Sequence, residues 1–142
     1  MIHSPSISLP RARRRANVKN IAYWLTTLMG PFSFVMGGTM FLTHQPHMIQ
    51  TLAKLGYPEY LATILGIGNL LGAIICVLPG LARLKEWAYA GFTILLGGAF
   101  ASHILNGDSL AIALQPIFFL ILVIASWALR PESRRLRSEE AR

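Results

Sequence analysis

The chain has 142 residues, of which 54% are hydrophobic and 13% are charged, and its formal net charge is +7. This composition argues against a water-soluble domain, because a chain this small has too little interior for so much apolar surface, and soluble domains carry about 25% charged residues. Since the basic residues lie mainly in two terminal tails and not on one face of a folded domain, we expect a lipid bilayer as the partner and no nucleic acid.

The first predicted element is a basic cytoplasmic tail, residues 1–20, followed by a membrane span at residues 21–42. About 20 apolar residues cross a hydrocarbon core of about 30 Å, and Gln45-Pro46 interrupts the uncharged stretch after that length. A cleaved signal peptide is the alternative for this segment. The apolar run is longer than the 7–15 residues of such a peptide and no A-x-A site follows it, so a retained span is favoured.

Residues 46–55 are predicted to form a short amphipathic helix on the membrane surface. Pro46 suits a first helical turn, and Gly56 is a typical stop after a last turn. The apolar residues of the segment share one side of such a helix: Met48, Ile49, Leu52 and Leu55.

Three further uncharged stretches predict spans at about residues 60–78, 87–104 and 109–129. A charged cytoplasmic tail, residues 131–142, completes the chain. The predicted fold class is therefore all-α: a four-helix transmembrane bundle over residues 21–130, with a short interfacial helix between the first and second spans.

The distribution of Lys and Arg predicts how the bundle is oriented. With four spans, 12 of the 13 basic residues fall on the side of the two tails, and Lys54 alone falls on the other. The positive-inside rule then places both termini in the cytoplasm, and we expect a multi-pass protein of the cell (inner) membrane. Trp24, Trp87 and Trp127 agree with this, because they fall at the cytoplasmic interface, where tryptophan is enriched.

Small residues gather on one face of each of the first three spans, as in membrane helices whose backbones approach closely. Packing between helices is the favoured interpretation of these faces, and a cavity is the alternative. The glycines predicted to take part in packing are Gly30, Gly37, Gly68, Gly72, Gly91 and Gly98.

Asn69 is the strongest candidate for a ligand contact, because it is a polar residue halfway through the apolar second span. The alternative is a hydrogen bond to a neighbouring helix, for which Gln115 or Ser126 in the fourth span is a candidate partner. No Asp, Glu, Lys or Arg falls deep in a predicted span, which argues against a proton or ion pump.

The outer side gathers histidines and carboxylates. His103 is a candidate proton donor or acceptor for a molecule bound at the outer leaflet. No metal site is expected, and His44 and His47 are only weak candidates for ligands, since Pro46 separates them. The candidate ligand-binding residues are Asn69, His103, Gln115, Trp87 and Asp108.

The sequence contains none of the common motifs of soluble nucleotide-binding or hydrolytic enzymes. Its single cysteine, Cys76, allows no disulfide within the chain, and a thiol–disulfide enzyme acting alone is not expected. Cys76 itself is interpreted as a small apolar-facing residue. We therefore do not expect the chain to catalyse a reaction on its own.

From about Trp24 to Pro131 the sequence resembles the DoxX-like family of small four-helix membrane proteins. The run Arg83–Phe92, followed by Ser102-His103 and Gly107-Asp108, carries the resemblance. Gly56-Tyr57-Pro58, Gly66 and Leu71-Gly72-Ala73 also match.

The resemblance implies an accessory or redox-linked membrane subunit, because the family is named after a subunit associated with quinone-linked oxidation. A quinone is the cofactor it suggests, and a membrane redox partner or a second copy of the chain are the suggested protein partners. Many members have a lysine where this chain has Asn69. If that lysine has a chemical role in those members, the same role is in doubt for this chain. A small-molecule transporter working as an oligomer and a purely structural assembly partner are the alternative functions.

Overall fold

The computed structural model describes residues 9–136, and this part of the chain contains helices and no strand. Four helical stretches are long and apolar enough to cross a membrane, which confirms the predicted fold class; the stretch from Arg14 to Leu42 counts as one of them. The parts of the two predicted tails before residue 9 and after residue 136 lie outside the described residues. In chain order the elements are α1 (Leu9–Met29), α2 (Ser33–Leu42), α3 (Pro46–Lys54), α4 (Tyr60–Val77), α5 (Ala82–Leu105), α6 (Leu110–Leu129) and the 3-10 turn η1 (Glu132–Arg134).

The first predicted span is broken in the middle. Instead of one helix over residues 21–42, α1 begins at Leu9 and ends before Gly30-Pro31, and α2 starts anew at Ser33. Pro31 has no N–H to continue the helical ladder, and this is a common cause of a sharp kink. Gly30 lies against α6, where a Cβ would come within 3.1 Å of the Leu122 carbonyl carbon.

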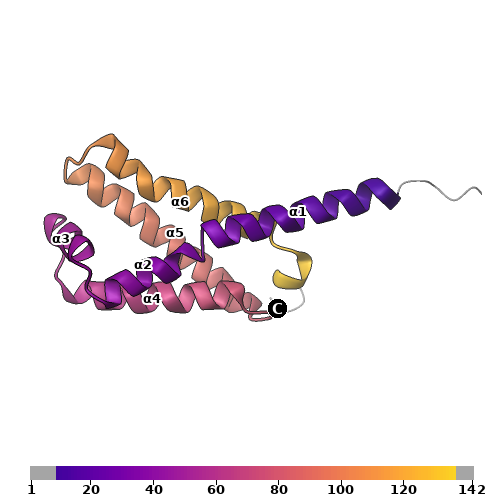
Figure 1. The fold of residues 1–142 in the computed structure, drawn as a ribbon, viewed down its shortest axis with the longest axis horizontal. Coiled ribbons are helices and arrows are strands. Elements are labelled where there is room, and N and C mark those ends of the chain that lie inside the picture. The colour runs from indigo at the N-terminus through magenta and orange to yellow at the C-terminus, as the bar shows by residue number, and fades with distance from the viewer. Residues whose placement is uncertain (1–8, 137–142) are drawn as a thin grey trace, which may run out of the picture.

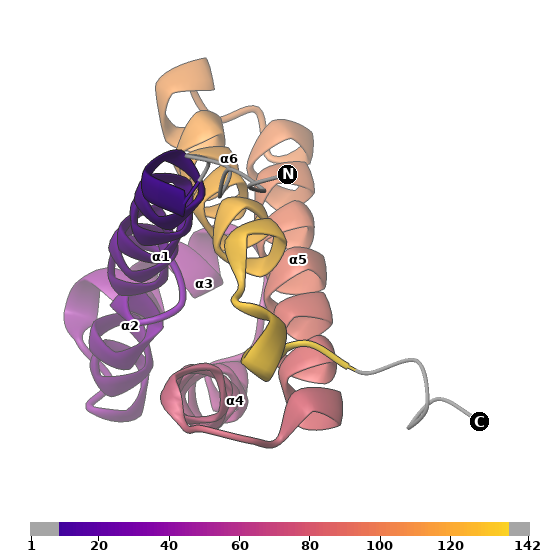
Figure 2. The same ribbon diagram turned by 90° about the vertical axis from the view of Figure 1, so that its right-hand side faces the viewer.

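The break lets the two halves of this segment pack on different neighbours. α1 contacts α6, whereas α2 contacts α4, and α5 contacts both α4 and α6. Figure 1 shows the result: the α2/α4 pair and the α5/α6 pair diverge toward one end of the bundle, where α3 lies. The start of α1 and the turn η1 both lie at the opposite end, and Figure 2 views the bundle from that end.

The ends of the other helices differ from the predicted ends by at most one residue, except at the start of α5. α5 begins at Ala82, five residues before the predicted start at Trp87. α6 contains Pro116 in its interior, which the sequence analysis did not single out. The remaining helices, α3 and α4, each end one residue before their predicted ends.

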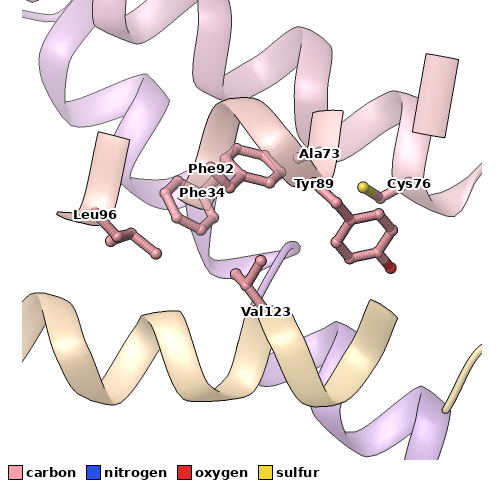
Figure 3. Packing of buried hydrophobic residues seen from close by; sticks show 7 residues of the cluster. All are labelled: Phe34, Ala73, Cys76, Tyr89, Phe92, Leu96 and Val123. Atoms are coloured by element: carbon pink, nitrogen blue, oxygen red, sulfur yellow. The ribbon is translucent and has the colours of Figure 1, made fainter. Parts of the chain in front are cut away.

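An aromatic stack forms the centre of the hydrophobic core (Figure 3). The rings of Phe34 and Phe92 lie 4.0 Å apart between centroids, at an interplanar angle of 22°. Leu96 and Val123 belong to the same buried cluster, so that α2, α5 and α6 all contribute to it. This core joins the helix pairs on the side of the bundle away from α3.

Helices α2 and α4 come into backbone contact at Gly38 of α2 and Gly66 of α4. A Cβ added to either residue would lie 2.9 Å from the backbone oxygen of the other. Neither glycine was predicted for packing, although both face a neighbouring helix at backbone contact. The pair lets α2 and α4 lie side by side, as small residues commonly do in membrane helices.

The structure divides the glycines that were predicted for packing into two groups. Gly30 and Gly72 lie against another helix, since a Cβ on Gly72 would be 2.7 Å from the Phe92 ring. A Cβ on each of the others would have no heavy atom of the described chain within 4 Å: Gly37, Gly68, Gly91 and Gly98.

Candidate functional site

A cavity of about 510 Å³ occupies the half of the bundle where the helix pairs diverge. It lies between α2, α4, α5 and α6, and α3 closes its end. Most of its lining is apolar, and the volume is in the range of small-molecule sites. The apolar lining includes Phe34, Met36, Met40, Met48, Leu52, Leu65, Ile94, Leu96 and Phe119.

Three of the predicted ligand contacts, Asn69, Gln115 and His103, line this one cavity. Asn69 is only 4% exposed, yet its amide makes no hydrogen bond to any residue that the structure describes. The interhelical partner considered for it, Ser126, instead bonds to Thr27 at 2.7 Å. Among the described residues, the fully buried side-chain polar atom that lacks a partner is Arg130 Nη1 and not an atom of the Asn69 amide, so this amide keeps some accessible surface. Because Asn69 lines the cavity, a molecule bound there can form hydrogen bonds with it.

His103 is held at the cavity by a fixed carboxylate. Its Nδ1 lies 2.7 Å from Oδ2 of Asp108, and Lys54 Nζ donates to Oδ1 of the same carboxylate at 2.5 Å. These hydrogen bonds, from His103 first and then from Lys54, lower the pKa of Asp108 from its usual 3.8 to about 2. Asp108 therefore remains an anion at any physiological pH, although it does not line the cavity itself.

Two polar contacts connect the end of α3 and the turn after it to α5 and the α5–α6 loop, at the end of the cavity. The first is the Lys54–Asp108 ion pair, which joins the end of α3 to the α5–α6 loop. The second is a hydrogen bond of 2.7 Å between the hydroxyls of Tyr57 and Ser102. Ser102 donates its own proton to the Gly98 carbonyl, so Tyr57 is the donor to Ser102. Sequence analysis did not assign these roles, although Lys54 stood out as the single cation of that side.

The cavity is open toward the sides of the bundle. Met36 on α2 and Ile94 on α5 both line it, and they are 68% and 75% exposed. Both residues lie within membrane-spanning stretches, so their exposed surfaces would face hydrocarbon. A molecule could therefore enter the cavity from the bilayer.

Trp87, His44 and His47 lie outside this cavity. Trp87 is 76% exposed and lies near the start of α5, at the far end of that helix from His103. His44 pairs with Glu59 at 3.2 Å. Within residues 9–136, no three His, Cys, Asp or Glu side chains come close enough together to hold a metal ion.

A second polar cluster lies at the opposite end of the bundle, where α1, α5 and α6 meet. Thr27 donates to the Tyr23 carbonyl at 2.7 Å and accepts from Ser126, which in turn accepts from the Tyr89 hydroxyl at 2.8 Å. Each hydroxyl proton is thus used within the protein. The chain of hydrogen bonds joins three helices and leaves no free donor for a ligand.

The same end contains two cations that the structure buries in the protein. Lys85 is fully buried, and it donates to the carbonyls of Leu78 and Gly80 just after α4. Arg130 is 3% exposed and pairs with Glu86 at 2.5 Å. This burial has a physical cause: carbonyls at and just after the end of a helix lack helical partners and carry partial negative charge, so cations fold back onto them.

The comparison with protein families gives one match. The family model of the DoxX-like family matches residues 24–126, which is more than two thirds of the chain and includes the whole of α2 to α5. Neither a curated protein nor a solved structure gives a significant match.

Proposed function

Because the chain belongs to the DoxX-like family and has four helical stretches able to cross a membrane, we propose that this multi-pass membrane protein binds a quinone in its cavity. It would serve as an accessory, redox-linked subunit whose partner carries out the electron transfer. A quinone combines a flat ring, polar oxygens and a long apolar tail, and the cavity offers a matching environment to each of these parts.

The unpaired amide of Asn69 is the observation that carries this proposal. It is 4% exposed at the inner end of an apolar cavity, with donor and acceptor both unused among the described residues. An amide in this position can donate to a ring carbonyl or accept from a ring hydroxyl. The Gln115 amide lines the same cavity and offers a second contact of the same kind.

The open sides of the cavity support the same class of ligand. The tail of an isoprenoid quinone could extend past Met36 or Ile94 into the bilayer, while the ring stays between the helices. Water-soluble ligands have no equivalent route, because the outer end is covered by α3 and held by the Lys54–Asp108 pair.

We further propose that both termini lie in the cytoplasm of a cell (inner) membrane, which places the cavity in the outer half of the bilayer. The support is the charge bias, since Lys54 is the one basic residue assigned to the cavity end. A fluorescent protein that matures only in the cytoplasm, fused after Arg142, is expected to fluoresce. A dark fusion at normal expression, paired with a bright fusion in the Gly56-Tyr57 turn, would reverse the orientation.

Filling the cavity is expected to remove the ligand. Gly37→Leu adds a side chain where a Cβ meets nothing within 4 Å, so the variant should fold and occupy part of the cavity. Gly68→Leu is the matched control, because Gly68 is equally open but does not line the cavity. Both variants and wild type would be purified in native lipid discs, and bound quinone would be measured by mass spectrometry.

Wild type and Gly68→Leu are expected to retain quinone in about stoichiometric amount, and Gly37→Leu to lose most of it. Asn69→Leu should weaken retention by about tenfold, since one buried hydrogen bond of about 1 kcal/mol is lost and a polar oxygen of the ligand is left unpaired. Wild-type protein that carries no quinone, or equal retention by both leucine variants, would rule out the proposed site.

A further inference from the structure

The Asp108 carboxylate determines which nitrogen of His103 carries a proton. An ionised carboxylate only accepts hydrogen bonds, and Oδ2 lies 2.7 Å from Nδ1 of His103. Its other oxygen is occupied by Lys54 Nζ at 2.5 Å and by the Asn106 amide nitrogen at 3.2 Å. Nδ1 is therefore the donor, and in the neutral imidazole Nε2 is left as an acceptor.

Nothing in the described chain uses this acceptor. The Nε2 atom of His103 has no hydrogen-bond partner among residues 9–136, and His103 lines the cavity. The hydroxyls on the same side are already committed, because Tyr57 donates to Ser102 and Ser102 donates to the Gly98 carbonyl. Beside His103, the cavity thus presents an acceptor and no free hydroxyl donor, and its free donors among the described residues are the amides of Asn69 and Gln115.

From this arrangement we infer that the cavity selects the reduced, hydroxyl-bearing form of its ligand, a quinol, with His103 Nε2 accepting the hydrogen bond of the ring hydroxyl. The inference rests on the proposed function, that the cavity binds a quinone-type molecule. The oxidised form has only carbonyl oxygens, which would face the lone pair of Nε2 without a proton between them. Asp108 is the positioning residue, because it acts on the ligand only through His103.

Binding of short-chain ubiquinone and of its reduced ubiquinol form would be measured on wild-type protein in lipid discs, anaerobically at pH 8. Ubiquinol is expected to bind about five- to tenfold more tightly, which corresponds to one net hydrogen bond. His103→Phe keeps a ring of similar size but no acceptor, so the ratio should fall to about one.

Asp108→Asn gives a sharper test, because it should reverse the preference. The asparagine amide can donate to Nδ1, and this places the imidazole proton on Nε2, where it would favour the quinone carbonyl. Lys54→Met is the matched control, since it removes the ion pair to Asp108 but keeps the carboxylate that orients His103, and it should still prefer ubiquinol.

The outcomes separate the two proposals. If neither form binds to wild type, the proposed function fails. If both forms bind with equal affinity, or the quinone binds more tightly, the proposed function stands and the inference is overturned. Where a variant does not fold, the ratio of the two affinities measured on wild type still decides the question.

Discussion

Gly66→Leu is expected to disrupt the pairing of α2 with α4 and to give protein that melts at least about 10 °C below wild type in detergent. A Cβ at this position would lie 2.6 Å from the Leu42 side chain and 2.9 Å from the Gly38 backbone oxygen. Overpacking of this kind costs about 3 kcal/mol, and a backbone atom cannot move aside as a side-chain end can. Separating the helices would also displace Asn69 from its buried position.

Gly68→Leu on the same helix is the matched control for this prediction. It makes the same substitution two residues away, at a position with no heavy atom of the described chain within 4 Å. Its melting temperature is expected to stay within a few degrees of wild type, because leucine is also the better helix former. Equal melting temperatures for Gly66→Leu and Gly68→Leu would show that α2 and α4 do not touch as described.

Lys85→Met is expected to destabilise the protein by about 2–5 kcal/mol. The substitution keeps the side-chain length but removes the ammonium that donates to the carbonyls of Leu78 and Gly80. A hydrogen bond from a charged donor contributes about 1.5–3 kcal/mol, and two such bonds are lost. Since Lys85 is fully buried, water cannot easily replace the lost donor.

Thermal unfolding in detergent would measure this loss, with Lys19→Met as the control. Lys19 is exposed on α1, so its replacement by the same residue should leave the melting temperature nearly unchanged. A Lys85→Met variant as stable as Lys19→Met would mean that Lys85 acts as an ordinary interfacial cation.

The spans could be predicted from the sequence because lipid demands about 20 uncharged residues for each crossing, and charge marks their ends clearly. The break in the first span could not be placed in this way. Hydropathy is continuous through Gly30-Pro31, and only the contact of α1 with α6 and of α2 with α4 reveals why the direction changes there. Pro31 was the one residue of this segment from which the break could have been predicted.

The packing glycines show why helical periodicity alone does not predict which glycine contacts a neighbouring helix. Gly37 and Gly38 are adjacent, and a helical wheel separates them by about 100° without saying which side meets a neighbour. The structure puts Gly38 against α4 and leaves Gly37 on the cavity. Which face is covered depends on the tilt of α2, and that follows from the break before it.

Single polar residues within apolar stretches of the sequence correctly indicated part of the cavity lining. Asn69, Gln115 and His103 were each notable in the sequence, and the structure brings them to one cavity. Trp87, which was also predicted as a ligand contact, lies near the start of α5 and outside the cavity. The buried Lys85 could not be recognised, because a lysine beside a span end most often lies in the headgroup region.

The central claim, that a quinone occupies the cavity covered by α3, is tested most directly by photoaffinity labelling. An azido-quinone would be irradiated with the protein in lipid discs, and the labelled peptides would be identified by mass spectrometry. The account predicts labels within α2, α3 and the first half of α6 around Gln115 and Phe119, with labelling suppressed in Gly37→Leu and unchanged in Gly68→Leu. Labels confined to the opposite end, near Tyr89 and Trp127, or labelling that Gly37→Leu leaves intact, would contradict it.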